Sequence, residues 1–224
     1  MERAISLIQI WSPQASRNLC DTLGMNVTQL FPTPVADFSL GRDFTEAELN
    51  FIIKDAERRP NGFNETSVNG YILESPELAG LKDFVLKCAE EYARQVWRVQ
   101  DSCGLRLTQS WVNYTKPGES HHRHIHANSL YSGVMYVATD NARDKIHFYR
   151  HEPSTLRPDY AEYNMFNTES WWLPADTGSM VIFPSTLEHA VTQVGDGIER
   201  CSLAFNFFPC GVIGNFGALT EARI

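Results

Sequence analysis

The chain has 224 residues, of which 43% are hydrophobic and 21% are charged, and its formal net charge is −8. This length and composition suit one globular domain with a full hydrophobic core. A net negative charge gives no general attraction to phosphate backbones or anionic membrane surfaces. We therefore expect no nucleic-acid partner and no membrane association.

The sequence carries no signal for secretion. Its longest apolar runs are too short to span a bilayer, and no basic segment precedes a hydrophobic stretch with a cleavage site. The five cysteines are odd in number, scattered, and never arranged as C-x-x-C, which suits reduced thiols inside a cell. We expect a cytoplasmic protein in which the cysteines are structural.

The first part of the chain is predicted to be irregular. Residues 1–40 are rich in turn formers, and Pro13, Pro32 and Pro34 interrupt short apolar runs. Proline removes a backbone donor and breaks regular elements. We expect extended or loosely paired segments here.

Residues 41–103 are expected to form a helical support region. A first helix is predicted over Phe44–Arg58, with Thr45 as its N-cap and glutamates in the first turn. A second helix is predicted over Pro76–Val99, where apolar residues recur at helical spacing. These helices supply an apolar face that must pack against something.

From Leu105 onward, short β-branched and aromatic runs alternate with Gly, Pro and Asp or Asn, which predicts seven or eight strands. The segments are Leu105–Tyr114, Tyr131–Val137, Lys145–Tyr149, Ser170–Leu173, Ser179–Phe183, His189–Val194 and Cys201–Phe208. Strands that follow helices indicate a mainly β, α+β fold. We expect a closed double-sheet core over 104–210, helices packed on one sheet, and a C-terminal tail over 211–224.

Four of the seven histidines fall within six residues, at positions His121, His122, His124 and His126. On an extended backbone, residues i and i+2 point to the same side, so an H-x-H pair can aim two imidazoles at one metal. The pair is His124 with His126 or, in another register, His122 with His124. A solvated polar loop is the competing interpretation.

The third candidate ligand is His189, which follows a β-strand run ending at Pro184. Alone, a histidine there is more often a hydrogen-bonded core residue. Arg200 comes eleven residues later and opens a very apolar strand, so it needs an anionic partner, and its guanidinium suits a carboxylate. A salt bridge with the local acids Glu199 or Asp196 is the alternative.

Five blocks of the sequence together resemble a family of 2-oxoglutarate- and Fe(II)-dependent oxygenases related to prolyl hydroxylases, including members found in marine phages. The blocks are His124-x-His126, Ser132–Tyr136, Gly178–Pro184, His189 and Arg200-x-Ser202. The resemblance covers roughly 105–208, about half of the chain. It implies a double-stranded β-helix, or jelly roll, with iron at one open end. A phage-encoded member would act in the cytoplasm of its host.

The resemblance also implies roles for individual residues. Fe(II) would bind His124, His126 and His189, while the far carboxylate of 2-oxoglutarate would be held by Arg200, Ser202 and Tyr114, a tyrosine ten residues before the H-x-H pair. The implied reaction is O2-dependent hydroxylation of a C–H bond in a peptidyl or small-molecule substrate, with formation of succinate and CO2. The metal and the cosubstrate carry this chemistry, so no further side chain is required as acid or base.

One position departs from the family pattern. The wider superfamily holds iron with two histidines and one carboxylate, and the carboxylate position is His126 in this chain. Either His126 is the third ligand, or a distant acid completes the site, with Asp140 and Asp144 as candidates. Three neutral ligands would leave the metal one unit more positive and alter its redox potential.

Residues 150–168 form a long loop with weak periodicity, and such loops are usually functional. We expect a lid over the site that offers the cationic and aromatic side chains Arg150, His151, Arg157 and Tyr160. Strand aromatics are further candidates for lining the pocket, although a core position is the commoner role: Trp111, Tyr131, Tyr136, Phe148 and Phe205. The sequence does not indicate an oligomeric state.

Two other functions stay open. A three-histidine cupin, a metal enzyme that does not use 2-oxoglutarate, is favoured by Gly118 before the H-x-H pair. No glutamate follows His126 at the cupin spacing, however, and a cupin gives Arg200 no role. A non-catalytic jelly-roll protein, either metal-binding or structural, is favoured by the missing carboxylate.

Overall fold

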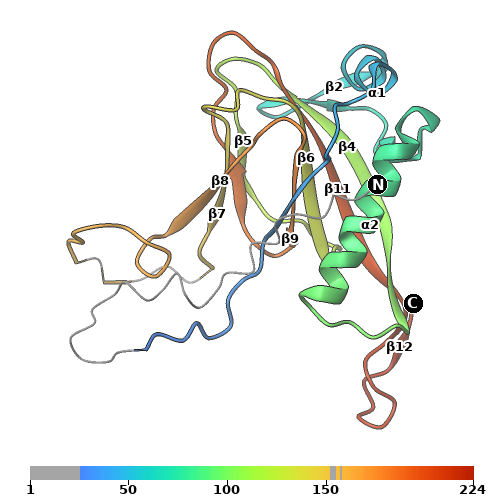
Figure 1. Ribbon diagram of the computed structural model, residues 1–224, viewed down its shortest axis with the longest axis vertical. Helices are drawn as coiled ribbons and strands as arrows, with labels where there is room; N and C mark the ends of the chain where they lie inside the picture. The colour runs from blue at the N-terminus through green and yellow to red at the C-terminus, as the bar shows by residue number, and fades with distance from the viewer. Residues whose placement is uncertain (1–25, 152–154, 157) are drawn as a thin grey trace.

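The computed structural model describes residues 26–151, 155–156 and 158–224. It contains two antiparallel sheets that face each other, with a long helix against the outer face of the larger sheet (Figure 1). The predicted fold class, mainly β with helices on one sheet, is confirmed. No helix in the described ranges combines the length and the apolar character needed to cross a membrane.

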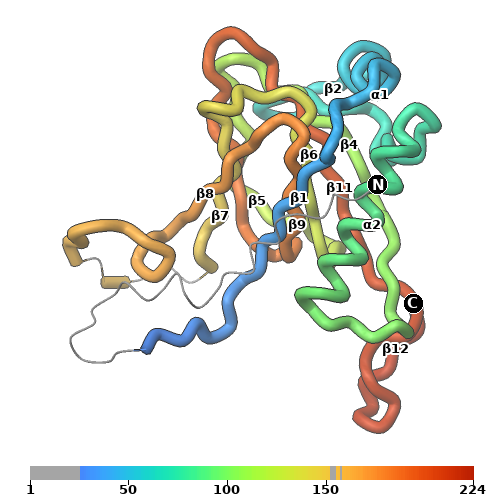
Figure 2. The backbone as a smooth tube through the Cα atoms, viewed as in Figure 1, coloured from blue at the N-terminus to red at the C-terminus, as the bar shows by residue number. Residues whose placement is uncertain are grey.

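The larger sheet, called the major sheet, takes strands from both ends of the chain. In spatial order they are β1 (Ala36–Ser39), β9 (Ser179–Pro184), β6 (Tyr131–Ala138), β11 (Arg200–Ile213), β4 (Cys103–Thr115), β3 (Asn64–Ser67) and β2 (Arg58–Asn61). Figure 2 shows β1 running along β9 at one edge. The short β12 (Ala222–Arg223) turns back onto the end of β11.

The smaller sheet, called the minor sheet, has strands of three to five residues. In spatial order they are β5 (His121–His124), β10 (His189–Val191), β7 (Lys145–Tyr149) and β8 (Ser170–Pro174). All of its pairings are antiparallel. The described part of the β7–β8 connection projects away from the two sheets (Figure 2).

The helices are shorter than predicted. Thr45 caps α1 (Glu46–Asn50) in a capping box with Glu48, and the chain continues as a π-helical turn, η2 (Phe51–Asp55), before Arg58 enters β2. Two 3-10 turns, η3 (Ile72–Glu74) and η4 (Pro76–Leu78), lead into α2 (Ala79–Gln95). Pro76 therefore starts a 3-10 turn rather than the α-helix.

Several strands were not predicted. β2 and β3 form a hairpin inside the expected helical region, and β5 contains most of the histidine cluster. Their sequences are short and polar, so they lack the apolar alternation that marks a half-buried strand. Sheet formation here depends on pairing with neighbours such as β4 and β10 rather than on local propensity.

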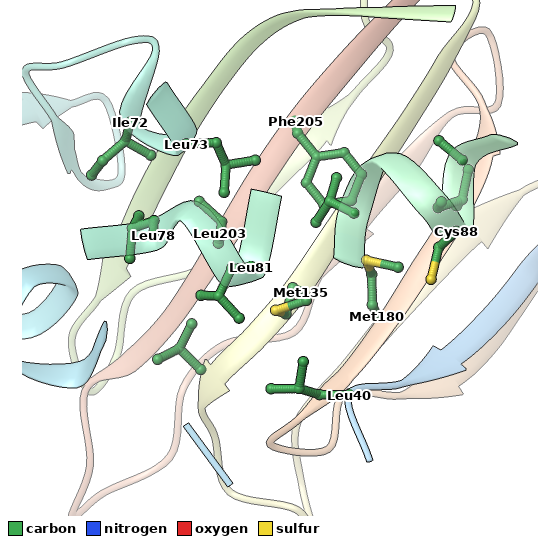
Figure 3. Close-up of a cluster of buried hydrophobic side chains, with 14 of the residues drawn as sticks. Leu40, Ile72, Leu73, Leu78, Leu81, Cys88, Met135, Met180, Leu203 and Phe205 are labelled. Atoms are coloured by element: carbon green, nitrogen blue, oxygen red, sulfur yellow. The ribbon is translucent and has the colours of Figure 1, made fainter. Parts of the chain in front are cut away.

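The main hydrophobic core lies between α2 and the major sheet. Leu81 and Cys88 of α2 lie near Leu203 and Phe205 of β11 and Met135 of β6 (Figure 3). Each large apolar side chain buried there contributes roughly 1.5–3 kcal/mol. A second, smaller cluster fills the space between the two sheets. Because the helix side of the major sheet is fully packed, a polar site is left to its opposite face.

Candidate metal centre and carboxylate pocket

Three histidines of the minor sheet converge on one point. His124 ends β5, His126 follows two residues later, and His189 opens β10 directly opposite His124. One side-chain nitrogen from each lies within 4.8 Å of the other two, and the Nε2 atoms of His126 and His189 are 3.4 Å apart. Two nitrogens bound to one metal at about 2.0–2.1 Å, as found for zinc, lie about 3 Å apart, so the 3.4 Å separation of His126 and His189 suits a shared metal. The group therefore fits one metal ion.

Backbone carbonyls orient two of these rings. The Nδ1–H of His124 donates to the carbonyl of His122 at 2.7 Å, and the Nδ1–H of His189 donates to the carbonyl of Leu187 at 2.9 Å. A proton held on Nδ1 leaves Nε2 with a lone pair. Both rings are thus set in the tautomer that binds a metal through Nε2.

Burial keeps the three rings neutral. It lowers the pKa of His189 to about 3 and that of His126 to about 4, and the neighbouring His124 adds to both shifts. Burial also lowers the pKa of His124. A neutral imidazole is the form that binds metal. The site is therefore ready to bind at neutral pH without losing a proton.

A bulge in β5 separates the histidines into two groups. The pairing of β5 with β10 shifts between His124 and His121, so both side chains reach the interior although they are three residues apart. His121 contacts the side-chain amide of Asn64 at 3.3 Å. His122 is exposed and lies against Phe63, 6.2 Å between ring centroids. The inward H-x-H pair is therefore His124 with His126.

The major sheet forms the opposite wall of a cavity of about 40 Å³ that the histidines line. Alternate residues of β4 and β11 face it and pair across the strands: Trp111 with Ala204, Asn113 with Ser202, and Thr115 with Arg200. The ring centroid of Trp111 lies 5.7 Å from that of His126. The cavity thus joins neutral nitrogen ligands on one sheet to polar groups and one cation on the other.

Arg200 is buried, with 2% of its side chain exposed. Its Nη1 donates to Asp144 Oδ1 at 2.8 Å and to the carbonyl of Thr192 at 2.7 Å. Its Nη2 is also buried and has no hydrogen-bond partner among the described residues. Nη1 of the guanidinium is therefore bonded to the protein, whereas the N–H groups of Nη2 are available to a ligand.

Tyr114 is not brought to this cavity. It lies on the helix side of β4, where its hydroxyl donates to the carbonyl of Ile52 at 2.5 Å and the guanidinium of Arg58 covers its ring. The reason is strand alternation, because neighbouring residues of one strand face opposite sides. The prediction that Tyr114 binds 2-oxoglutarate was therefore wrong, because its side chain points to the helix side of the sheet and not into the cavity.

A different tyrosine lies on the cavity side of the major sheet. Tyr136 of β6 pairs with Ser202, which pairs with Asn113, so the three form one row across the sheet. The Tyr136 hydroxyl is buried and lacks a hydrogen-bond partner in the described part of the chain. Arg200 and Asp144 both act on its pKa, which burial raises. Its hydroxyl thus belongs to the same buried polar region as Arg200.

Neither distant acid completes the metal group. Asp144 is committed to Arg200, and the candidate metal group found in the described ranges consists of the three histidines alone. The predicted alternative partner of Arg200, Glu199, instead binds Arg58 at 3.0 Å. The candidate group in the described ranges therefore contains no carboxylate.

None of the described residues among those predicted for the loop lines the cavity. The Arg150 guanidinium donates to carbonyls of its own loop, at Met165, Phe166 and Thr168. Tyr160 packs edge-on against Tyr163, 5.8 Å between centroids. His151 is exposed, and Arg157 lies outside the described residues. Arg150 thus shapes the loop.

The five candidate pocket aromatics divide among three places. Trp111 lines the cavity, Tyr131 and Phe205 belong to the helix-side core, and Tyr136 and Phe148 belong to the cluster between the sheets. Four of the five are thus core residues, which is the commoner role for aromatics in strands.

Asn113 and Thr115, which line the cavity, were missed by sequence reasoning, whereas His121 was considered only as part of the histidine cluster and Asp144 only as a candidate metal ligand. The first two had a signal, because residues 111–115 alternate between apolar and polar from Val112 onward. That alternation separates Asn113 and Thr115 from Tyr114. No local signal identifies Asp144, whose partner is 56 residues away in sequence.

Comparison with known proteins identifies the family that this arrangement resembles. A family model of 2OG-Fe(II) oxygenases matches residues 109–206. The resemblance seen in the sequence is confirmed. The cofactors expected from the sequence, Fe(II) and 2-oxoglutarate, are those of this family. The matched range contains all three histidines as well as Arg200 and Ser202.

Solved structures of 2-oxoglutarate-dependent oxygenases share the fold. An oxidoreductase of the 2OG-Fe(II) oxygenase family from Burkholderia pseudomallei has a TM-score of 0.56 and 10% identity, covering 77% of this chain and 83% of that one. The epimerase SnoN of nogalamycin biosynthesis has a TM-score of 0.54 and 13% identity, covering 80% and 81%. HygX from Streptomyces hygroscopicus, with nickel, 2-oxoglutarate and hygromycin B bound, has a TM-score of 0.52 and 13% identity, covering 78% and 82%. No curated protein matches the sequence.

Proposed function

We propose that the chain is an oxygenase that uses O2 and 2-oxoglutarate to hydroxylate a C–H bond of a peptidyl or small-molecule substrate. The net reaction converts one 2-oxoglutarate, one O2 and one C–H group into succinate, CO2 and one alcohol. The observation that carries the proposal is the meeting of three neutral histidines and a buried arginine at one cavity. Although Asp144 pairs with Nη1, the buried Nη2 of Arg200 has no partner among the described residues, and a buried donor is stabilised when it gains an acceptor such as a carboxylate.

The proposed metal ligands are His124, His126 and His189. Their donor set fits a divalent transition metal, since imidazole suits iron and its close relatives. Fe(II), when bound there, supplies the redox chemistry with O2 and a Lewis-acid contact for the cosubstrate. The protein's part is to fix three nitrogens on one side through β5, β10 and the carbonyls that orient the rings. The other side faces the cavity and is left for small ligands.

The proposed carboxylate donors lie on the major sheet. We infer that Arg200 holds the far carboxylate through Nη2, with help from the hydroxyls of Ser202 and Tyr136. A charge-assisted bond from a guanidinium is roughly twice as strong as a neutral one, and burial strengthens it further. The support for this assignment is that Nη2 and the Tyr136 hydroxyl are buried without partners among the described residues.

The proposed substrate wall continues from the metal ligands along the minor sheet. His124, His189, Phe148 and Trp171 pair in one row across the four strands, so they share the inner face. Trp171 closes the row at the sheet edge and is 45% exposed. Together with the lid proposed over 150–168, including His151, Arg157 and Tyr160, it would offer an aromatic surface to a peptide side chain or small molecule.

The test is an anaerobic titration of Fe(II) and 2-oxoglutarate, followed by the visible charge-transfer band of the chelate. Wild-type protein should show the band, and Arg200→Ala should need a far higher 2-oxoglutarate concentration. Absence of the band in wild type would overturn the proposal. Admission of O2 should then yield succinate, whereas a redox-silent metal-binding protein would yield none.

The type of reaction requires a separate measurement, because the fold also serves the epimerase SnoN. Mass spectrometry of a substrate candidate distinguishes the outcomes. Hydroxylation adds one oxygen atom from O2, whereas epimerisation leaves the mass unchanged. Product of unchanged mass, formed together with succinate, would replace hydroxylation within the same family.

A further inference from the structure

Arg200 is shared between the protein and the cavity. Its Nη1 binds the Asp144 carboxylate at 2.8 Å, and both side chains are only 2% exposed. Arg200 lines the cavity, and its Nη2, on the other arm of the same guanidinium, is buried without a partner among the described residues. A carboxylate bound through Nη2 would therefore share one cation with a resident carboxylate.

Asp144 does not depend on Arg200 for its position. Its Oδ2 accepts the backbone N–H of Asp140 at 2.9 Å, and its own backbone N–H donates to the Asp140 carbonyl at 2.8 Å. Its carbonyl accepts the N–H of Ala175 at 3.1 Å. The turn before β7 thus fixes the carboxylate through main-chain bonds. An asparagine at this position keeps the same shape and the main-chain bonds, but its single side-chain oxygen can accept from only one of the two donors that the Asp144 carboxylate binds.

The sum of the charges around the cavity depends on Asp144. Three neutral imidazoles add no charge to a divalent metal, and 2-oxoglutarate is a dianion, so metal and cosubstrate cancel. Arg200 would then leave one positive charge buried, and Asp144 neutralises it. A site with two histidines and one carboxylate has that negative charge on the metal itself. In this chain the negative charge belongs to Asp144, which binds Arg200 rather than the metal.

We propose that Asp144 supplies the negative charge that a three-histidine centre lacks, and that it thereby limits how tightly the cavity holds a dianionic cosubstrate. The inference rests on the proposed function. Asp144 acts through Arg200 and is a positioning residue: it keeps the guanidinium in place and repels a second carboxylate on its other arm. Like charges that share one partner weaken each other's binding.

The test compares 2-oxoglutarate binding to anaerobic Fe(II)-loaded wild type and Asp144→Asn by calorimetry. The variant should bind 2-oxoglutarate about tenfold more tightly, because a repulsive charge is lost while the arginine remains. Without ligand its melting temperature should fall, and 2-oxoglutarate should raise it more than in wild type. Asp140→Asn is the matched control, since the same turn loses an acid that does not touch Arg200.

A double variant tests the charge count itself. His126→Asp places a carboxylate at the metal, so it should weaken 2-oxoglutarate binding. Adding Asp144→Asn to it should return the dissociation constant to within about threefold of wild type, because the total charge is restored. A double variant as weak as His126→Asp alone would overturn the inference.

One measurement needs no variant to fold. The amide of 2-oxoglutarate at its far carboxylate carries one charge less, and wild type should prefer the diacid by less than about tenfold, because Arg200 is already neutralised. A preference above about 100-fold contradicts the inference, as does unchanged or weaker binding in Asp144→Asn. Wild type that binds no 2-oxoglutarate at all would overturn the proposed function as well.

Discussion

The two sheets contribute different chemistry to the same cavity. The minor sheet brings three histidines that carry no charge, from short strands whose other face carries exposed or partly exposed residues. The major sheet brings a buried ion pair and a row of polar side chains, from long strands whose other face packs on α2. The proposed metal site and the proposed anion site thus lie on separate sheets.

This separation predicts that substitutions on the two sheets affect different properties of the protein. Losing a ligand on the minor sheet should affect metal binding while the main core remains intact. Changing Arg200 should affect the stability of the whole domain, because its charge is buried in the sheet on which the core depends. The predictions below test whether the two frameworks are as independent as the structure indicates.

The largest effect is expected for Arg200→Ala. It removes one member of a buried pair and leaves Asp144 without its cation, which costs about 3–5 kcal/mol of the free energy of unfolding. Urea unfolding of the metal-free protein measures this loss. Lys82→Ala, which breaks an exposed pair with Glu74, should cost much less.

A double variant separates the fold from the anion site. Arg200→Met with Asp144→Leu replaces the pair with apolar side chains and should recover most of the stability, since such replacements are often neutral or stabilising. It should still fail to bind 2-oxoglutarate. If 2-oxoglutarate binds normally to the double variant, Arg200 is not the anion site.

The next effect concerns the minor sheet. His189→Ala removes the buried ligand, and metal affinity should fall by more than the roughly 10–100-fold that loss of an outer partner costs. His147→Ala is the control, because His147 neighbours this position on β7 but pairs with Ala190, whose side chain faces the other way. Equal losses in both variants, measured by competition with a metal chelator, would show that the effect is not ligation.

The fold was largely predictable because its strongest signals are local. Strands such as Lys145–Tyr149 carry their pattern within five residues, and the Thr45 cap is a short motif. Strands β2, β3 and β5 were missed because pairing, not propensity, makes them strands. The local sequence of a polar four-residue segment does not indicate which strand it will pair with.

The site was predictable on the same terms. The histidine cluster and the distance to Arg200 are visible in the sequence, whereas the face of Tyr114 and the partner of Arg200 depend on strand register and on a contact across 56 residues. Alternation along β4 could have corrected Tyr114. The unpartnered hydroxyl of Tyr136 and the contact between Asp144 and Arg200 depend on the tertiary structure, so the sequence alone does not reveal them.

A further prediction tests the helix side of the major sheet. Gly133 pairs with Phe205, and a Cβ at Gly133 would lie 2.4 Å from that ring and 2.7 Å from the Val181 carbonyl. Gly133→Ala should therefore lower the free energy of unfolding by about 1–3 kcal/mol, with metal affinity unchanged in the folded protein. Gly70→Ala meets nothing closer than 3.8 Å and is the control. A similar small loss in both would show that the sheet adapts.

The smallest effect is a pH dependence of the metal-free protein. The pKa of His126 is lowered to about 4 and that of His189 to about 3, both mainly by burial, against about 6.5 in an unfolded chain. At a pH between the folded and the unfolded pKa, each histidine is protonated in the unfolded state but not in the folded state. The free energy of unfolding therefore falls as the pH drops below about 6.5. Each histidine adds at most about 1.4 kcal/mol per pH unit. His126→Gln should reduce the slope of unfolding free energy between pH 6.5 and 5, where few carboxylates titrate. Identical slopes in wild type and the variant would mean that the ligand nitrogens are hydrated in the metal-free protein, and the minor sheet would then be more open than the major sheet it faces.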